Sequence, residues 1–350
     1  MDGGITRAPG RERWLRLTLV AGSLVAILSA LAILEGAFRI VDPDLMVEKR
    51  GLQRYHPRLG WENRPGASSA MDGVEVSIDG RGRRLTGQAG GAAFANTHVL
   101  LLGDSVAFGL GVSDHETFAA SLTQGSAPYR VTNLAVPGYG PDQSLLRYQS
   151  EAGAIGASVV ILALCLGNDL ADVVSRHHLY DERLPNPRFL LRNGDLHLED
   201  DHVGGHRLRM LLDRSFLLTW FGPSVKESGP DHEQTARRLE ALRAHSEEAE
   251  ETLVAVVRRL RSAVLRRGSR FVVAAFPDFR TLDHKSVRWP RLREKLAPHV
   301  DLLDLTPVLA RDHETYSRNT LDKIGHLSKQ GHEHAARAIR THLSRNTDAP

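Results

Sequence analysis

Four short polar segments hold the residue types that acyl transfer requires. They centre on Ser105, Gly138, Asn168 and the pair Asp322 and His326. This chemistry needs a nucleophile, a base, an acid that orients the base, and hydrogen-bond donors for the oxyanion. We assign these roles to Ser105, His326 and Asp322 in that order. The candidate oxyanion donors are the backbone N–H groups of Ser105 and Gly138 and the side-chain amide of Asn168.

The first three segments each follow an apolar run that favours a buried strand. Five such runs occur, at 97–104, Tyr129–Ala135, Ser158–Cys165, Arg270–Phe276 and Val300–Leu305. Helical patterns separate them, notably over Glu233–Arg267, where leucine and valine recur at helical spacing. Alternating strands and helices predict a parallel sheet with helices on both faces. Ligands bind such sheets at the carboxyl ends of the strands, where the polar segments would gather.

The same segments resemble the SGNH hydrolases of the GDSL esterase/lipase superfamily. Its Ser, Gly, Asn and His markers fall, in family order, on Ser105 in LLGDSVAFGLGV, Gly138 in NLAVPGYGPDQ, Asn168 in LCLGNDL and His326 in GHLSKQGH. The resemblance spans about 96–343. It implies a flavodoxin-like three-layer α/β/α domain with a five-stranded parallel sheet, over 96–345, and a serine mechanism acting on esters. The G-x-S-x-G elbow of α/β-hydrolases is absent, which disfavours that fold.

One departure from the family concerns the acid. Members usually read D-x-x-H, whereas position 323 is Lys and Asp322 lies four residues before His326. Either a longer loop lets Asp322 reach the imidazole, or His326 works in a dyad with Ser105, oriented by a backbone carbonyl. His177 and His178 follow the Asn168 segment and are further candidates for the border of the site.

The N-terminus predicts a membrane segment. Leu17–Leu34 carries no charge, and its length as a helix, roughly 27 Å, approaches the hydrocarbon thickness of a bilayer. Four arginines precede it, so 1–16 should be cytoplasmic and the remainder extracytoplasmic, periplasmic or extracellular. The sequence beyond it also resembles membrane-anchored bacterial members. The rival interpretation is a signal peptide cleaved near Ala30-x-Ala32, which would release a secreted protein.

Two further regions flank or interrupt the predicted sheet. Residues 35–95 are rich in Gly, Pro and Arg and predict a connector with short strands, such as Val74–Ile78, rather than part of the core. Residues 176–231 form an insertion, with a hairpin around Asn193-Gly194 and an amphipathic helix over Leu208–Phe221. We expect this insertion near the active-site edge. It would act as a lid or specificity element, as a packing helix, or with its apolar face on the membrane.

Composition narrows the function classes. The chain has 350 residues, with 45 Lys and Arg against 42 Asp and Glu. This small net charge does not predict that the protein binds nucleic acid. The single Cys165 excludes an internal disulfide, and we expect neither a metal nor a cofactor. The sequence predicts an envelope serine esterase for short, acetyl-type esters of a carbohydrate or lipid. An O-acyltransferase with the same residues and a non-catalytic scaffold stay open, as does the oligomeric state.

Overall fold

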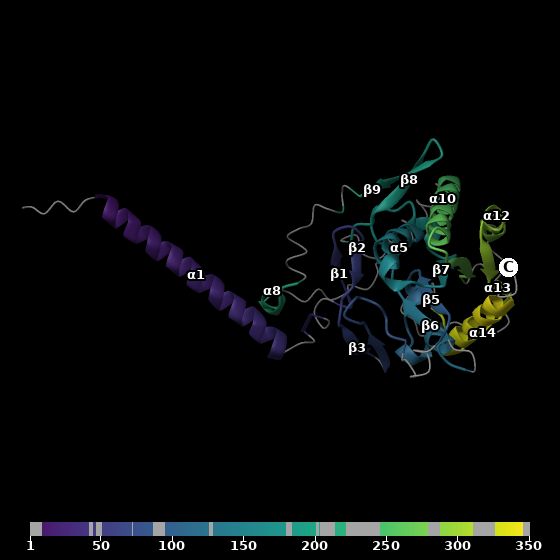
Figure 1. The fold of residues 1–350 in the computed structure, drawn as a ribbon, viewed down its shortest axis with the longest axis horizontal. Coiled ribbons are helices and arrows are strands. Elements are labelled where there is room, and N and C mark those ends of the chain that lie inside the picture. The colour runs from purple at the N-terminus through teal and green to yellow at the C-terminus, as the bar shows by residue number, and fades with distance from the viewer. Residues whose placement is uncertain are drawn as a thin grey trace, which may run out of the picture.

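The computed structural model describes residues 9–41, 45–46, 51–71, 73–86, 95–125, 129–179, 184–200, 203, 214–221, 246–278, 288–310 and 326–345. Its centre is a five-stranded parallel sheet of order β11-β10-β7-β5-β6 (Figure 1). The strands are β5 (His98–Leu102), β6 (Arg130–Asn133), β7 (Val159–Cys165), β10 (Arg270–Phe276) and β11 (Asp301–Asp304). All five predicted strands are confirmed, in the spatial order of flavodoxin-like folds.

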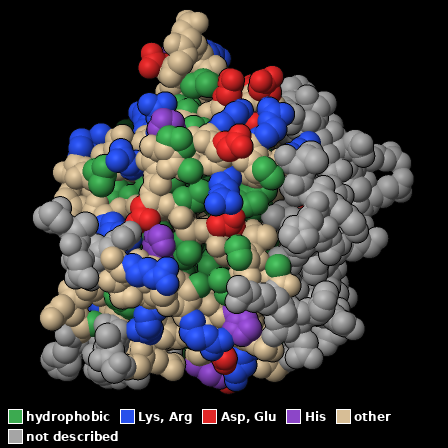
Figure 2. Space-filling model, turned by 90° about the vertical axis from the view of Figure 1, so that its right-hand side faces the viewer, with side chains coloured by type: hydrophobic (Ala, Val, Ile, Leu, Met, Phe, Trp, Pro, Cys, Tyr) green, Lys and Arg blue, Asp and Glu red, His purple; other side chains and the backbone are tan. Residues whose placement is uncertain are grey.

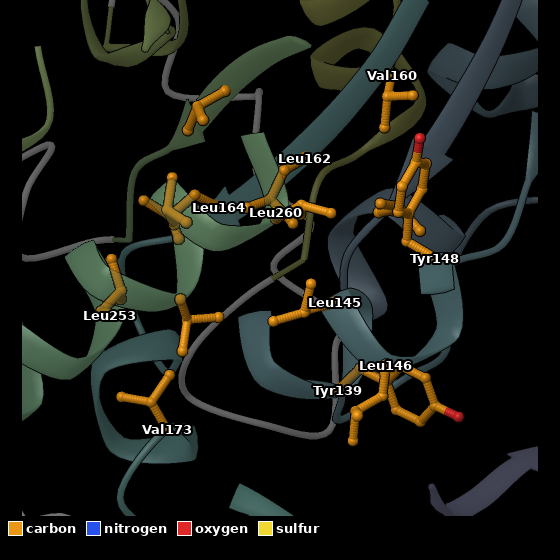
Figure 3. Close-up of a cluster of buried hydrophobic side chains, with 14 of the residues drawn as sticks. Tyr139, Leu145, Leu146, Tyr148, Val160, Leu162, Leu164, Val173, Leu253 and Leu260 are labelled. Atoms are coloured by element: carbon orange, nitrogen blue, oxygen red, sulfur yellow. The ribbon is translucent and has the colours of Figure 1, made fainter. Parts of the chain in front are cut away.

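Helices cover both faces of the sheet. One face carries α5 (Pro141–Ile155), α10 (Ser246–Leu265) and α12 (Arg288–Leu296), and the other α3 (Ser105–Phe108), α4 (Phe118–Leu122), α13 (Thr306–Leu309) and α14 (Lys329–Arg345). Along β7, alternate residues enter the two separate cores. Figure 3 shows Leu162 and Leu164 beside Leu145 of α5 and Leu260 of α10. The three-layer α/β/α prediction is therefore confirmed.

The first helix, α1 (Pro9–Val41), extends away from the rest of the chain (Figure 1). Its segment Glu12–Val41 contains an 18-residue window with a mean hydropathy of 2.5, none of which is buried, which makes the segment long and apolar enough to cross a membrane. The predicted apolar run Leu17–Leu34 lies inside it. The helix continues seven residues further, through 35–41, which the sequence had placed in the connector.

The connector prediction is wrong for 51–86. Its short strands exist, as the hairpins β1 (Gln53–His56) with β2 (Gly60–Asn63) and β3 (Ser68–Met71) with β4 (Val74–Ser77). Yet Tyr55 and Trp61 are fully buried, and Trp61 belongs to the main core. The buried Arg84 guanidinium donates to three backbone carbonyls of 108–112 and pairs with Asp114 at 3.0 Å. Residues 51–86 therefore pack against the predicted domain as part of its core.

The insertion divides into two parts. Its hairpin, β8 (Arg188–Arg192) and β9 (Asp195–Glu199), is confirmed and packs against α10. Asn193 and Gly194 both have positive φ, 52° and 86°, as a two-residue type I′ turn requires. The predicted helix Leu208–Phe221 is seen only as α8 (Phe216–Phe221). Residues 214–215 are not helical and 208–213 lie outside the described residues. α8 packs against α1 (Figure 1).

The domain surface carries charges of both signs. On the face drawn in Figure 2, basic and acidic side chains alternate with small apolar areas among the coloured residues. This pattern is typical of a solvent-facing surface. It contrasts with α1, where large apolar side chains such as Ile33 and Val20 are more than 60% exposed, at 71% and 67%.

Candidate active site

A tight strand-to-helix turn presents Ser105. β5 ends at Leu102, and α3 begins at Ser105. Gly103 between them has φ +143°, and a Cβ there would lie 2.8 Å from the carbonyl oxygen of Ala163 on β7. Only glycine fits this close approach of two strands. The half-buried Ser105 thus lies where β5 and β7 part, at the topological switch point of the sheet.

His326 forms a hydrogen bond with this serine. Its Nε2 lies 3.0 Å from Ser105 Oγ, although 221 positions separate the two in the chain. Two neighbours fix the backbone beside it: Leu327 is buried in the core, and Ser328 Oγ accepts from the N–H of Gly331 in the first turn of α14. A nucleophile and a base within hydrogen-bond reach are the starting geometry for attack on an acyl group.

Asp322, the predicted acid, lies outside the described residues, so its role stays a prediction. The same holds for the choice between a triad and a dyad. Both interpretations require that His326 Nε2 faces the nucleophile, which is the observed orientation.

Asn168 follows β7 and lies beside the nucleophile turn. Its Nδ2 donates to Asp172 Oδ2 at 2.7 Å and to Asp104 Oδ2 at 3.1 Å. Asp104 in turn immediately precedes Ser105 and caps α3 through the N–H of Val106. Both amide hydrogens of Asn168 are thus directed at carboxylates. Donation to an oxyanion requires the exchange of one of these bonds, and the longer one, to Asp104, is the weaker.

Four buried carboxyl groups gather here: Asp104, Asp142, Asp169 and Asp172. Burial raises the pKa of each of them, to about 7 for Asp142, and neighbouring carboxylates add to the rise for Asp169 and Asp172. No motif in the sequence predicts a role for these four groups. They are not arranged as a metal centre, since the described residues contain no group of three or more His, Cys, Asp or Glu able to hold an ion.

The loop after β6 carries Gly138 to the same edge. The N–H of Val136 donates to the Gly103 carbonyl at 3.1 Å, which ties the loop to the nucleophile turn. From the other side, Trp61 Nε1 donates to the carbonyl of Pro137 at 3.0 Å. Residues 51–86, which the sequence predicts as a connector, therefore contact the loop that carries Gly138, a candidate oxyanion donor. In the sequence, Gly60-Trp61 is part of the resemblance to membrane-anchored bacterial members, but nothing there indicates this contact.

His178 covers Gly138. A Cβ at Gly138 would lie only 2.0 Å from His178 Nε2, and the residue has φ +81°. Both facts require glycine at this position. The His178 ring also packs edge-on against Trp61, with ring centroids 4.9 Å apart. This finding matches the interpretation of His178 as a residue bordering the site.

Two other polar residues near the motifs are structural. His332 is fully buried, its Nδ1 accepts from the N–H of Phe118 at 3.2 Å, and burial lowers its pKa to about 3. It is therefore neutral at ordinary pH. Cys165 ends β7 inside the core, and burial raises the pKa of its thiol. A neutral thiol buried in this way is a poor nucleophile.

A serine hydroxyl paired with an imidazole at the carboxyl edge of a parallel sheet is an arrangement that serine hydrolases use for nucleophilic attack. No protein-family model matches the chain, and a search of curated proteins finds no relative. Several solved structures are similar to this chain, among them two G-D-S-L lipolytic proteins and an acetylxylan esterase.

A G-D-S-L lipolytic family member from Veillonella parvula shares 12% identity and a TM-score of 0.40, over 71% of this chain and 99% of its own. A proposed G-D-S-L lipolytic protein from Desulfitobacterium hafniense has 14% identity and a TM-score of 0.38, over 71% and 100%. An acetylxylan esterase from Geobacillus stearothermophilus has 13% identity and a TM-score of 0.37, over 71% and 94%. Sequence identities and TM-scores this low carry no argument about function, so the function proposed below is argued from the geometry of the site.

Proposed function

We propose that this protein is a serine ester hydrolase. The observation that carries the proposal is the 3.0 Å hydrogen bond between His326 Nε2 and Ser105 Oγ. In the first step His326 accepts the hydroxyl proton as Ser105 Oγ attacks the ester carbonyl, and the alcohol leaves with a proton returned by His326. In the second step water attacks the acyl-serine with His326 again as base, which releases the acid and restores Ser105.

The oxyanion formed in each step needs preorganised donors. We assign this role to the backbone N–H groups of Ser105 and Gly138 and to the side chain of Asn168. Support comes from the bond that ties the Gly138 loop to the nucleophile turn and from the bond between Asn168 and Asp104. Asp322 is the proposed acid that orients His326.

The proposed substrate is a short-chain, acetyl-type ester of the cell envelope, on a carbohydrate or a lipid. The rings of His178 and Trp61 occupy the space beside Gly138, which favours a small acyl group. The envelope location follows from α1, for which we propose a single membrane crossing with 1–16 in the cytoplasm and the domain outside. The four arginines before the apolar run Leu17–Leu34 support this orientation, and the exposed apolar surface of α1 supports the crossing.

The test uses the full chain in detergent micelles with p-nitrophenyl acetate and longer-chain esters. Ser105→Ala and His326→Ala should each abolish hydrolysis while circular dichroism stays unchanged. Matched controls are Ser262→Ala on exposed helix surface and His197→Ala on the exposed hairpin, which should keep full activity.

Covalent labelling adds an independent measurement. A fluorophosphonate probe should label the wild-type chain and the two controls but not Ser105→Ala. Hydrolysis that survives in Ser105→Ala would refute the proposal. Labelling at Ser105 without hydrolysis would instead indicate that the acyl group passes to an acceptor hydroxyl rather than to water.

A further inference from the structure

Hydrogen bonds to Glu35 hold the short helix α8 against α1. Glu35 is the first residue after the apolar run Leu17–Leu34. The Glu35 carboxylate accepts from the N–H of Phe216 at 2.9 Å and from the N–H of Leu217 at 3.0 Å. It also accepts from the Ser215 hydroxyl at 2.9 Å. These bonds satisfy donors that the first turn of α8 would otherwise leave unpaired. The start of α8 therefore lies beside the part of α1 that directly follows the apolar run.

Aromatic contacts continue the attachment one turn further along α1. The rings of Phe38 and Trp220 lie 4.8 Å apart between centroids. The Arg39 guanidinium lies 4.8 Å from the centre of the Phe216 ring and also donates to the carbonyl of Arg214 at 2.9 Å. Hydrogen bonds, a ring pair and a cation–π contact thus hold α8 in one place on α1.

Apart from these contacts, α8 leaves apolar side-chain surface uncovered, including part of Trp220. Leu218, Trp220 and Phe221 are 47%, 43% and 79% exposed. The end of α1 beside it is also bare, with Ile40 and Val41 at 84% and 78%. Elsewhere in the described part of the domain, large exposed apolar side chains are isolated leucines. A contiguous group of this kind marks an interaction surface.

The position of this group along α1 indicates its partner. Among the described residues, the exposed Trp and Phe side chains are Trp14, Trp220 and Phe221. Residues 14 to 38 of α1 span about 36 Å at about 1.5 Å per residue. That length falls between the hydrocarbon thickness of a bilayer, about 30 Å, and its full thickness of about 40–45 Å. In a chain that crosses the bilayer with α1, Trp14 and the Phe38–Trp220 pair would therefore lie at the two interfaces, where aromatic residues concentrate.

We propose that α8 is an interfacial anchor that inserts Leu218, Trp220 and Phe221 into the boundary between headgroups and acyl chains of the outer leaflet. The insertion 176–231 then supplies a second attachment to the membrane, beside the crossing by α1. Two attachments restrict rotation of the domain about the chain that links it to α1. This inference rests on the proposed crossing by α1 and is independent of the ester chemistry.

The experiment measures quenching of tryptophan emission by brominated phosphatidylcholine in vesicles that contain the full chain. Trp14→Phe removes the tryptophan at the opposite interface. Trp61 and Trp289 are buried in the domain and serve as an unquenched background. We expect loss of the emission that Trp220 contributes, stronger with bromine near the headgroup than deep in the chain. The double variant Trp14→Phe, Trp220→Phe should show no such loss.

A second variant tests the attachment itself. Glu35→Ala removes the acceptor for three donors of 215–217 and should reduce the quenching of Trp220 while α1 stays in the bilayer. Flotation with vesicles after carbonate washing reports on α1 separately. If the chain floats but Trp220 is not quenched, α8 is not an interfacial anchor, even though α1 crosses the membrane. If the chain does not float, both proposals fail. Concentration-dependent changes in Trp220 emission without quenching would assign the surface to a second copy.

Discussion

The contact between Asn168 and Asp172 allows a quantitative test of how the proposed oxyanion donor is held. Asn168→Ala removes the donor, and loss of one such group typically costs about 10²–10³ in kcat. Asp172→Ala leaves the donor but removes its shorter bond, 2.7 Å, to a carboxylate. Leaving a buried donor without its partner costs about 1–3 kcal/mol, so kcat should fall about 5- to 100-fold. If Asp172 acts only by positioning Asn168, the double variant should be no slower than Asn168→Ala.

The assay is kcat for p-nitrophenyl acetate with the four proteins of this double-mutant cycle, each checked for folding by thermal unfolding. We expect a coupling energy of about 1–3 kcal/mol. Asp172→Asn keeps an acceptor oxygen and should retain most of the activity, which separates positioning from a general effect of the buried carboxyl group. Additive losses in the double variant would refute the reasoning, as would full activity in Asp172→Ala beside a slow Asn168→Ala.

Three other predictions follow from single contacts. Gly138→Ala should lower kcat by at least about 10-fold, because its Cβ would meet His178 Nε2 at 2.0 Å and a left-handed alanine costs about 1–2 kcal/mol; steady-state kinetics checks this. Asp142 binds its proton more tightly in the folded chain, with a pKa of about 7, so it reduces stability as pH rises from about 4 through 7. Asp142→Asn should therefore raise the thermal midpoint at about pH 8 more than at about pH 5. Trp61→Phe leaves the Pro137 carbonyl without its indole donor and should reduce kcat more than stability, as parallel kinetics and unfolding would show.

The sheet could be predicted because its signals are local. Each strand is a short apolar run, and burial on both faces, as along β7, makes that run continuous. The polar residues that follow β5 and β7 then meet because the two strands pair directly. For Ser105 and His326 the family order of the motifs predicted a contact across 221 positions, and their hydrogen bond is the observed outcome.

Contacts made by single residues at long range could not be predicted in this way. Trp61 lies in a stretch rich in Gly, Pro and Arg, whose composition indicates a connector, yet its ring is fully buried. Arg84 is a charged residue that the sequence suggests is exposed, but backbone carbonyls and Asp114 replace its water. Such burial depends on partners elsewhere in the chain. For this reason the sequence does not indicate that residues 51–86 pack with the core of the domain.

The insertion 176–231 contacts both the candidate active site and α1. Near its start His178 covers Gly138, and near its end α8 is fastened to Glu35 of α1. Between them Glu199 accepts hydrogen bonds from Arg176 and Arg188, which lower its pKa to about 2 and clamp the base of the hairpin. Deletion of the whole insertion would therefore disturb the candidate site and the membrane contact together. Single substitutions at the two ends, at His178 and at Trp220, test the two effects one at a time.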